Sequence, residues 1–566
     1  MKQKCIPANR TTFRDIAILT GLILFNVIAD YFWLRRDNII PLSKACGYFC
    51  TMMDYYDCLK KFGGINPLAM LDLLKDQLVH NPHGPAYNLT GAFLMLLFDK
   101  SVLKLIIFNN TPYVILLIVS TYLLGRHIAD QNTGLAAAVL LALYPAVFGT
   151  SRMYILEFAT MGVATLSQLI LLKSESFSKR GYSILYGVSA AWGMLIKSEF
   201  IAFIIGPLIY VLLRTIYPMS VARSKAGDRR RLLNFFFACG AFCLLAGIRF
   251  PELYFKTLGL AYEPAPRWFN FELATLDLYL YQLGGFFFLV FLMGAFYFFR
   301  NDNTKADAKI ILASWILIPW TILVMAPHQA NLTYTLPYLP SIALISAIGS
   351  AGLSRKVRHI LMAITLIIGL VQYYDFSFDG GPCLDRGFSW RGHEISYFRL
   401  SGDMCRRAAP TDEQSNIDAK ILSFVERRLN RYPAKRVLMA ASFAIPNYDI
   451  TRWTAIKIIR KLPFVLELFP VAPPSDVIKR LSAYDFILTA RLSTDPDLKS
   501  AAWFENQSKK IAWRNSSTDK RFHLTGEEME KLKSRYVSLM KGFRCSNIYD
   551  QNKMVVSLCE RPSKGV

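Results

Sequence analysis

The chain has 566 residues, of which 53% are hydrophobic and 14% aromatic, and its mean hydropathy is +0.29. This composition over this length predicts many membrane spans and excludes a protein built around one large water-soluble core. The net charge is +24, but loop lysines and arginines that orient membrane helices on an anionic inner leaflet account for that excess. We therefore expect membrane lipid, and no nucleic acid, as a partner.

The first apolar run, residues 16–34, predicts a membrane helix that is not cleaved off. It is too long for the apolar region of a secretion signal and lacks a small-residue cleavage site. The mixed stretch 35–100 is too polar to span the membrane, and we expect it to form short amphipathic helices at the outer interface. The basic residues before the first run predict a cytoplasmic N-terminus; they are Lys2, Lys4, Arg10 and Arg14.

Ten further apolar segments follow, which brings the number of predicted spans to eleven. If these spans alternate from a cytoplasmic N-terminus, most loop lysines and arginines fall on the cytoplasmic side, as the positive-inside rule requires. The same alternation places the stretch 35–100, Glu157 and everything after Tyr374 on the outer side. The ten segments are 102–125, 134–149, 158–172, 182–196, 199–217, 233–248, 279–299, 309–325, 333–352 and 358–374.

The C-terminal part, residues 376–566, is polar and contains no run long enough to span a membrane. Its helix-like and strand-like stretches alternate, which predicts a soluble α/β domain on the outer side. The predicted fold is therefore an α-helical polytopic membrane domain over 1–375, with 35–100 as its external loop, followed by this extracytoplasmic domain. The expected helices are 416–431 and 526–540, and the expected strands are 436–441, 484–490, 544–549 and 554–559.

Four of the ten cysteines lie in this C-terminal part, where disulfides can persist if it is extracytoplasmic. Four cysteines permit three pairings, and the sequence does not choose among them. Three more cysteines lie in the stretch 35–100, and without paired histidines nearby they favour a structural role over a metal site. The four C-terminal cysteines are Cys383, Cys405, Cys545 and Cys559.

The predicted span 134–149 carries Tyr144-Pro145 near its end, and the turn between it and the span 158–172 carries Ser151-Arg152 and ends at Glu157. An ionisable side chain directly beside a membrane span is costly unless it has a function. The pattern therefore makes Glu157 a candidate functional residue on an outward-facing turn.

Three other motifs carry polar or proline residues beside apolar segments. Residues 81–88 read Asn-Pro-His-Gly-Pro-Ala-Tyr-Asn, residues 190–200 end in Lys-Ser-Glu-Phe, and residues 328–340 end in Leu-Pro-Tyr-Leu-Pro. His83 can bind a ligand or can be a turn histidine beside prolines. Lys197 can bind a ligand or can be a lysine at a helix end that reaches the interface. The sequence leaves both pairs of alternatives open.

In this order, the four motifs resemble those of the GT-C class of glycosyltransferases, which use polyprenyl-phosphate sugars; the resemblance covers about residues 10–375. They are most like the lipid-linked aminoarabinose and mannose transferases. The resemblance implies an outward cavity, a carboxylate that takes the acceptor's proton, and cations that hold the phosphate leaving group. It makes Glu157 a base or a metal ligand, and it makes Arg152, Lys197, His83, His328 and Tyr334 the substrate-binding residues.

One part of the class pattern is missing. After the first span the class has an acid, often Asp-Glu, shortly before an alanine and an aromatic residue, whereas residues 41–48 read Pro-Leu-Ser-Lys-Ala-Cys-Gly-Tyr. Asp37 at the exit of the first span, or Asp54 or Asp57 further on, can replace this acid. Each of the three can also be an ordinary interfacial charge. Alternatively, Lys44 marks a catalytically degenerate protein.

The sequence thus predicts an inverting glycosyltransferase in a bacterial inner membrane. Its donor would be an undecaprenyl- or dolichyl-phosphate sugar and its acceptor a glycan, lipid or protein, and a divalent metal ion would be its cofactor if Glu157 is a metal ligand. The alternative is a protein of the same fold without catalysis, serving as a lipid-binding or assembly partner in envelope polysaccharide synthesis. A secondary transporter would show internal repeats with matching broken helices, and the sequence shows none.

Overall fold

The computed structural model divides into two compact units, which are treated separately below. One is formed by Met1–Asp37 and Asp54–Ala409, and the other by Asn38–Met53 and Pro410–Val566. The described residues are 13–36, 43–61, 84–98, 101–221, 226–247, 282–301, 304–325, 332–378, 387–390, 393–396, 436–441, 465–468, 486–492, 526–541, 544–551 and 554–560.

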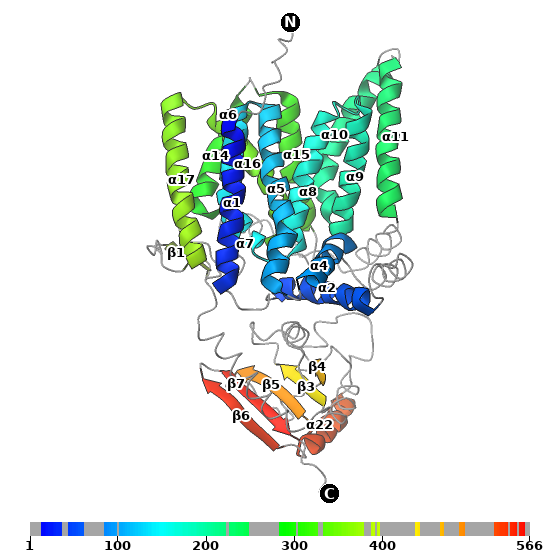
Figure 1. Ribbon diagram of the computed structural model, residues 1–566, viewed down its shortest axis with the longest axis vertical. Helices are drawn as coiled ribbons and strands as arrows, with labels where there is room; N and C mark the ends of the chain where they lie inside the picture. Colours follow the sequence, from blue (N-terminus) through cyan, green and yellow to red (C-terminus); the bar gives the residue numbers. More distant parts are fainter. Residues whose placement is uncertain are drawn as a thin grey trace. The chain divides into compact units, whose positions relative to one another are not determined.

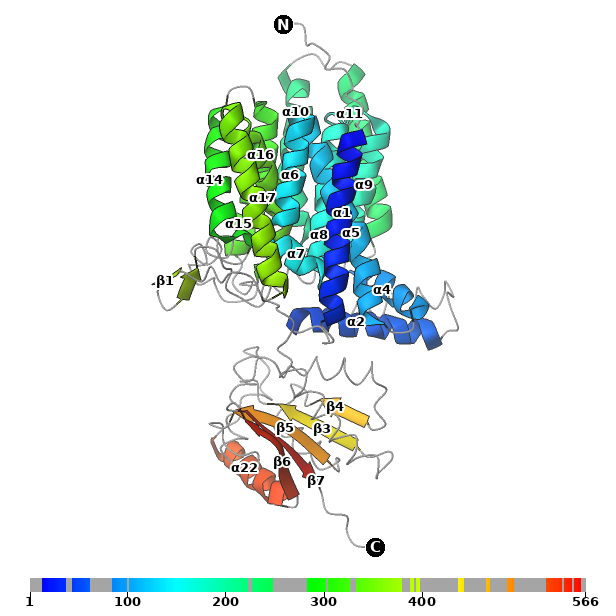
Figure 2. The ribbon, with the colours of Figure 1, turned by 60° about the vertical axis from the view of Figure 1, so that its left-hand side comes forward.

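The first unit is a bundle of apolar helices that run side by side (Figures 1 and 2). Each of the eleven predicted spans falls on a helix among the described residues. The helices are α1 (Phe13–Arg36), α4 (Pro85–Leu97), α5 (Val102–Ile128), α6 (Gln131–Leu143), α7 (Pro145–Ser151), α8 (Leu156–Lys173), α9 (Arg180–Ile196), α10 (Phe200–Val221), α11 (Ala226–Ala246), α14 (Gly284–Arg300), α15 (Ala306–Met325), η3 (Leu332–Tyr338), α16 (Leu339–Ser350) and α17 (Arg355–Phe378). A further helix, α2 (Ser43–Lys61), lies in the stretch 35–100.

Among the described residues, four helices have the length and hydropathy needed to cross a membrane, namely α1, α5, α8 and α17. The pair α6 and α7 reaches the same standard only if it is counted as one bent span. The helical, apolar character of the predicted fold is therefore confirmed. The number of eleven spans, and the division of the chain at residue 375, stay predictions.

The predicted span 134–149 is two helices, α6 and α7, which meet at an angle of 63°. Pro145 occupies the first position of α7, where its missing N–H is not needed, and a proline favours extended backbone in the residue before it. Tyr144 has that conformation, with φ −65° and ψ 126°. The bend carries α7 away from the direction of α6, so that the turn 152–155 and the start of α8 follow directly after a short helix.

Small residues allow two pairs of helices to touch through their backbones. A Cβ atom at Gly349 on α16 would overlap the carbonyl oxygen of Gly294 on α14, and a Cβ at Gly187 on α9 would overlap the carbonyl oxygen of Ala238 on α11. Close backbone approach at small residues is a common way of packing helices where lipid removes the hydrophobic driving force.

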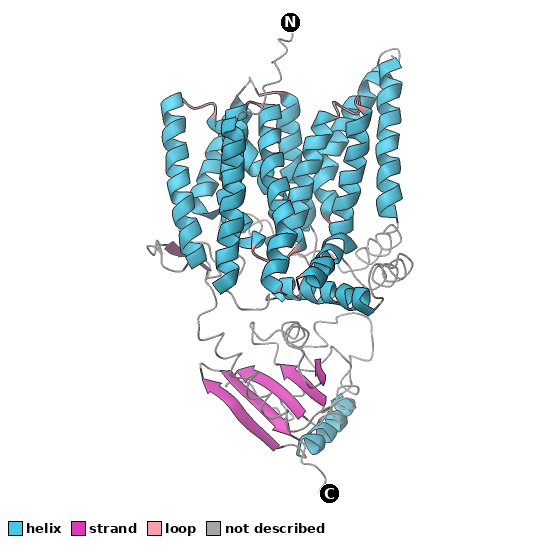
Figure 3. Cartoon of the chain, in the orientation of Figure 1, coloured by secondary structure: helices cyan, strands magenta, loops and turns pink. Residues whose placement is uncertain are grey.

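The second unit contains a five-stranded sheet of order β4-β3-β5-β7-β6. Its strands are drawn in magenta in Figure 3. β3 is parallel to β4 and β5, and β7 is antiparallel to β5 and β6. The elements are β3 (Arg436–Ala441), β4 (Val465–Leu468), β5 (Phe486–Leu492), α22 (Gly526–Lys541), β6 (Arg544–Gln551) and β7 (Met554–Glu560), and a short hairpin, β1 (Gly387–Trp390) with β2 (His393–Ser396), belongs to the first unit.

These elements coincide with the strands expected at 436–441 and 484–490, the helix at 526–540 and the C-terminal hairpin. The helix expected over 416–431 lies outside the described residues. Within the hairpin, the register places Cys545 directly opposite Cys559 on the neighbouring strand.

Candidate active site

Glu157 and Lys197 form a buried ion pair. Glu157 lies in the first turn of α8, and Lys197 is the residue that ends α9. The Lys197 Nζ lies 2.9 Å from the Glu157 Oε1, and the two side chains are 2% and 1% exposed. An acid near a helix N-terminus and a cation near a helix C-terminus both interact favourably with the helix dipoles. The acid expected on an outward-facing turn is therefore enclosed and paired.

A second carboxylate lies close to the same ammonium group. The Glu199 Oε1 is 3.8 Å from the Lys197 Nζ, and the Glu199 side chain is 27% exposed. Since an ammonium group is a compact charge with three rotatable donors, Lys197 can turn between neighbouring anions without a large change in its backbone.

The motif at 81–88 meets the motif at 190–200. The Gly84 N–H donates a hydrogen bond to the Ile196 carbonyl oxygen at 3.2 Å, one residue before Lys197. α4 begins immediately afterwards, with Pro85 in its first turn. His83 itself lies outside the described residues, but the residue that follows it is held beside the Lys197 turn.

Aromatic side chains from α4, α5, α9 and the turn 152–155 pack against one another. The Tyr87 ring centroid lies 4.7 Å from that of Tyr154 and 5.8 Å from that of Tyr113, which in turn lies 5.9 Å from the Trp192 ring. The Tyr87 hydroxyl donates to the Asn110 Oδ1 at 2.7 Å. Aromatic walls reduce the local dielectric response and strengthen charge interactions inside them.

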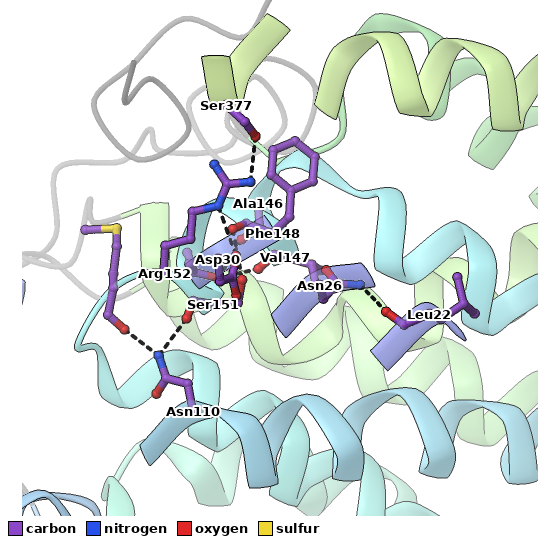
Figure 4. A network of polar contacts seen from close by, with 12 residues as sticks. Leu22, Asn26, Asp30, Asn110, Ala146, Val147, Phe148, Ser151, Arg152 and Ser377 are labelled. Atoms are coloured by element: carbon purple, nitrogen blue, oxygen red, sulfur yellow. Dashed lines mark hydrogen bonds and ion pairs between the residues drawn. The ribbon is translucent and has the colours of Figure 1, made fainter. Parts of the chain in front are cut away.

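The turn 152–155, which leads into Glu157, is held by side chains from other helices. The Asn110 Nδ2 donates to the carbonyl oxygens of Ser151 and Met153, each at 2.8 Å (Figure 4). The Tyr154 hydroxyl lies 3.3 Å from the Asn88 Oδ1. These contacts connect α4 and α5 to the residues that precede α8.

Arg152 lies in a second buried cluster, together with an acid that sequence reasoning missed. Its Nε lies 3.1 Å from the Asp30 Oδ1, and its Nη2 donates to the Ser377 Oγ at 2.6 Å (Figure 4). The predicted role of Arg152 in substrate binding stays a prediction. The signal that would have found Asp30 is an acidic residue inside the apolar run 16–34, because ionisable residues within membrane spans are rare and functional.

The structure gives less information about the remaining predicted site residues. Asp37, His83 and His328 lie outside the described residues. Asp54 is exposed on α2, and partial desolvation, followed by the nearby Asp57 carboxylate, raises the pKa of Asp54 above its ordinary value. Tyr334 lies in η3, a helix that packs against α8. The described residues include no group of three or more His, Cys, Asp or Glu side chains that could hold a metal ion.

Comparison with known proteins agrees with the motifs. Residues 82–226 match the family model of dolichyl-phosphate-mannose-protein mannosyltransferases. None of the curated proteins is similar enough in sequence to count as a relative.

Several solved structures are similar to the chain at low sequence identity. ArnT from Cupriavidus metallidurans in the apo state has 11% identity and a TM-score of 0.48, and the match covers 96% of this chain and 98% of that one. The arabinofuranosyltransferase AftD from Mycobacteria has 13% identity and a TM-score of 0.48, with 96% and 40% covered. The oligosaccharyltransferase AglB from Archaeoglobus fulgidus has 12% identity and a TM-score of 0.42, with 84% and 70% covered.

The segment that matches the family model contains the residues that the structure brings together. Gly84, Glu157 and Lys197 all fall within residues 82–226, although they come from three separate motifs. The resemblance to glycosyltransferases that use polyprenyl-phosphate sugars is therefore confirmed over this segment of the chain.

Proposed function

We propose that the protein is a membrane glycosyltransferase that moves a sugar from a polyprenyl-phosphate donor to an extracytoplasmic acceptor, which is a glycan, a lipid or a protein. The observation that carries the proposal is the buried Glu157–Lys197 pair, in which one carboxylate and one ammonium group meet at 2.9 Å within the family-matched segment. A carboxylate and a cation enclosed together are the two groups that such a transfer needs.

The proposed reaction is an inverting displacement at the anomeric carbon. A nucleophilic oxygen or nitrogen of the acceptor forms a bond to that carbon while the bond from the carbon to the phosphate oxygen breaks. The electron pair of the broken bond leaves with the lipid phosphate, whose charge Lys197 stabilises. Glu157 takes the proton of the acceptor.

The pairing of Glu157 with Lys197 implies that the donor binds before Glu157 accepts a proton. We expect the donor phosphate to compete with the Glu157 carboxylate for the Lys197 ammonium group, because this pair is shielded from solvent and charge interactions are strong there. Once the phosphate is bound, Glu157 loses its cation and becomes a better proton acceptor, since a nearby positive charge favours the ionised form of a carboxyl group. Donor binding thus prepares the base.

A second candidate function is a protein of the same fold that binds the lipid without catalysis. The observation that favours it is the first-loop stretch 41–48, which carries Lys44 where the class has an acid. In that case the Glu157–Lys197 pair would serve the fold and the lipid phosphate alone.

The test uses purified protein in nanodiscs with a panel of radiolabelled undecaprenyl- and dolichyl-phosphate sugars. We expect sugar release by the wild type and a loss of about 100-fold or more in Glu157→Gln, the range reported for removal of an acid–base group. Glu175→Gln is the matched control, because Glu175 is an exposed glutamate between α8 and α9 whose partner is Lys179. Lipid binding without release, unchanged by Glu157→Gln, would favour the second function.

The proposal includes an orientation, with a cytoplasmic N-terminus and the C-terminal α/β domain (376–566) on the outer side of a bacterial inner membrane. Residues that face each other on antiparallel strands have Cα atoms about 4.5–5.5 Å apart, a separation that a disulfide spans. Cys545 and Cys559 face each other in this way. In an oxidising compartment we expect their two thiols to lose two protons and two electrons to the disulfide of a thiol oxidoreductase and to form a bond.

Alkylation with N-ethylmaleimide before and after reduction, followed by peptide mass spectrometry on the full chain, checks the orientation. We expect a linked peptide pair that contains Cys545 and Cys559. Alkylation of both thiols without reduction would contradict either the outer location of the domain or the proposed pairing.

A further inference from the structure

The acid of the second buried ion pair lies on α1, a helix that also carries several exposed apolar side chains. On α1, the side chains of Leu24, Ile28 and Phe32 are each about half exposed, as expected for a helix that faces lipid. Asn26 and Asp30, one helical turn apart, are only 2% and 3% exposed. These two residues are therefore covered by the rest of the first unit, and Figure 4 shows Asp30 beside Arg152.

Side chains from α1, α7 and α17 contact Arg152. Besides its contacts with Asp30 on α1 and Ser377 on α17, its guanidinium carbon lies 5.1–5.3 Å from the ring centroids of Trp33, Phe148 and Tyr373. Stacking on aromatic faces and fork-shaped hydrogen bonding are the two interactions that a planar guanidinium makes best. Arg152 is therefore fixed in position and orientation.

Arg152 is also the first residue of the turn that delivers Glu157. It ends α7, and α8 begins four residues later at Leu156. Ile155, which precedes α8, provides no side-chain cap for the helix. The N-cap residue of α8 makes no side-chain capping hydrogen bond, so the position of the helix start depends on side chains that reach the turn from other helices. Among the residues that the structure describes, Asp30 makes an ion pair with the turn.

We infer that Asp30, acting through Arg152, is a positioning residue that holds the turn 152–155 and so sets where Glu157 meets Lys197. Its effect on activity rests on the proposed function, but its effect on the turn does not. If the Asp30 charge is removed, the Arg152 guanidinium becomes a buried cation without its acid, and the turn loses the anchor that connects it to α1.

Hydrogen–deuterium exchange on the full chain in nanodiscs tests the inference without any substrate. We expect Asp30→Asn to increase exchange of the amides in 151–157 by about tenfold, since local opening follows the loss of local contacts. Asp15→Asn is the matched control, because Asp15 is fully buried near the other end of the same helix, where it accepts a hydrogen bond from the Tyr122 hydroxyl at 2.7 Å. Unchanged exchange at 151–157 in Asp30→Asn, or the same increase in both variants, would overturn the inference.

Kinetics with the radiolabelled donors provide a second readout. A positioning role predicts that Asp30→Asn lowers kcat with little change in KM, that Asp30→Glu recovers part of the loss, and that Asp30→Asn with Arg152→Gln is no worse than the more affected single variant. Fully additive losses would show that Asp30 acts apart from Arg152, and this would overturn the inference. If the wild type releases no sugar, the proposed function fails, whereas the exchange experiment still decides the role of Asp30.

Discussion

Among the described residues of the first unit, the two buried ion pairs differ in the chemistry of their cations. Arg152 presents a planar guanidinium to Asp30, and three aromatic rings and a serine hydroxyl hold it. Lys197 presents an ammonium group to Glu157, with a second carboxylate 3.8 Å away. The first pair is surrounded by groups that fix it, whereas the second has a cation that can change partners. The difference separates a structural pair from one that is suited to exchange an anion.

The largest expected effect comes from breaking the exchangeable pair. Lys197→Met leaves the Glu157 carboxylate buried without its cation, which should lower the free energy of unfolding by about 3–5 kcal/mol and abolish sugar release. Lys197→Met combined with Glu157→Gln should recover most of the stability and none of the activity. The measurement is denaturant unfolding in mixed micelles beside the release assay. Wild-type stability in Lys197→Met would show that Glu157 is already neutral or that it has another partner.

A smaller effect is expected at the fixed pair. Arg152→Lys keeps the positive charge but loses the planar fork, and with it the hydrogen bond to Ser377 and the stacking, so the free energy of unfolding should fall by about 2–3 kcal/mol. The matched control is Arg214→Lys, because Arg214 forms an ion pair with Asp307 that is 36–54% exposed. Equal losses of unfolding free energy in the two variants would show that the buried surroundings of Arg152 do not make it more important to stability than the exposed Arg214.

The connection between the two pairs is tested at Asn110. Asn110→Leu removes the donor to two turn carbonyls and the acceptor of the Tyr87 hydroxyl, and we expect a loss of about 1–2 kcal/mol in the free energy of unfolding, with a lower kcat. Asn109→Leu is the neighbouring control, since the hydrogen bonds to the Ser151 and Met153 carbonyl oxygens come from Asn110 and not from Asn109. A larger loss in Asn109→Leu than in Asn110→Leu would contradict this account of the turn.

The smallest effect is expected at an exposed pair. Lys179 and Glu175 lie 2.7 Å apart between α8 and α9, with side chains 49% and 58% exposed. Water screens such a pair, so Lys179→Ala should change the free energy of unfolding by no more than about 0.5 kcal/mol. A loss as large as that of Lys197→Met, measured by the same unfolding curves, would mean that burial does not set the strength of these pairs.

The sequence predicted local features well and distant contacts poorly. The apolar segments coincide with helices because hydropathy over about 20 residues is a local property. Glu157 and Lys197 were singled out separately, but their contact spans 40 residues and needed the fold. Asp30 was missed because it lies inside an apolar run and its partner is 122 residues away.

The bend at Tyr144 and the cysteine register show the same limit. Hydropathy predicts one span over 134–149 even though it contains Tyr144-Pro145, because hydropathy does not report backbone direction, whereas the structure bends by 63° there. Among the C-terminal cysteines, sequence allowed three pairings, and only strand register places Cys545 opposite Cys559.

The backbone contact between α14 and α16 limits the substitutions that these two helices tolerate. Gly294 and Gly349 lie 55 positions apart in the chain (349 − 294), yet a Cβ atom at Gly349 would overlap the Gly294 carbonyl oxygen, and a Cβ atom at Gly294 would overlap the backbone of Ser346 on α16. A single replacement at either position forces the two helix axes apart, and with them η3, which is continuous with α16 and packs against α8. A homologue with a larger residue at position 349 would therefore need a larger separation between α14 and α16, or different residues between η3 and α8.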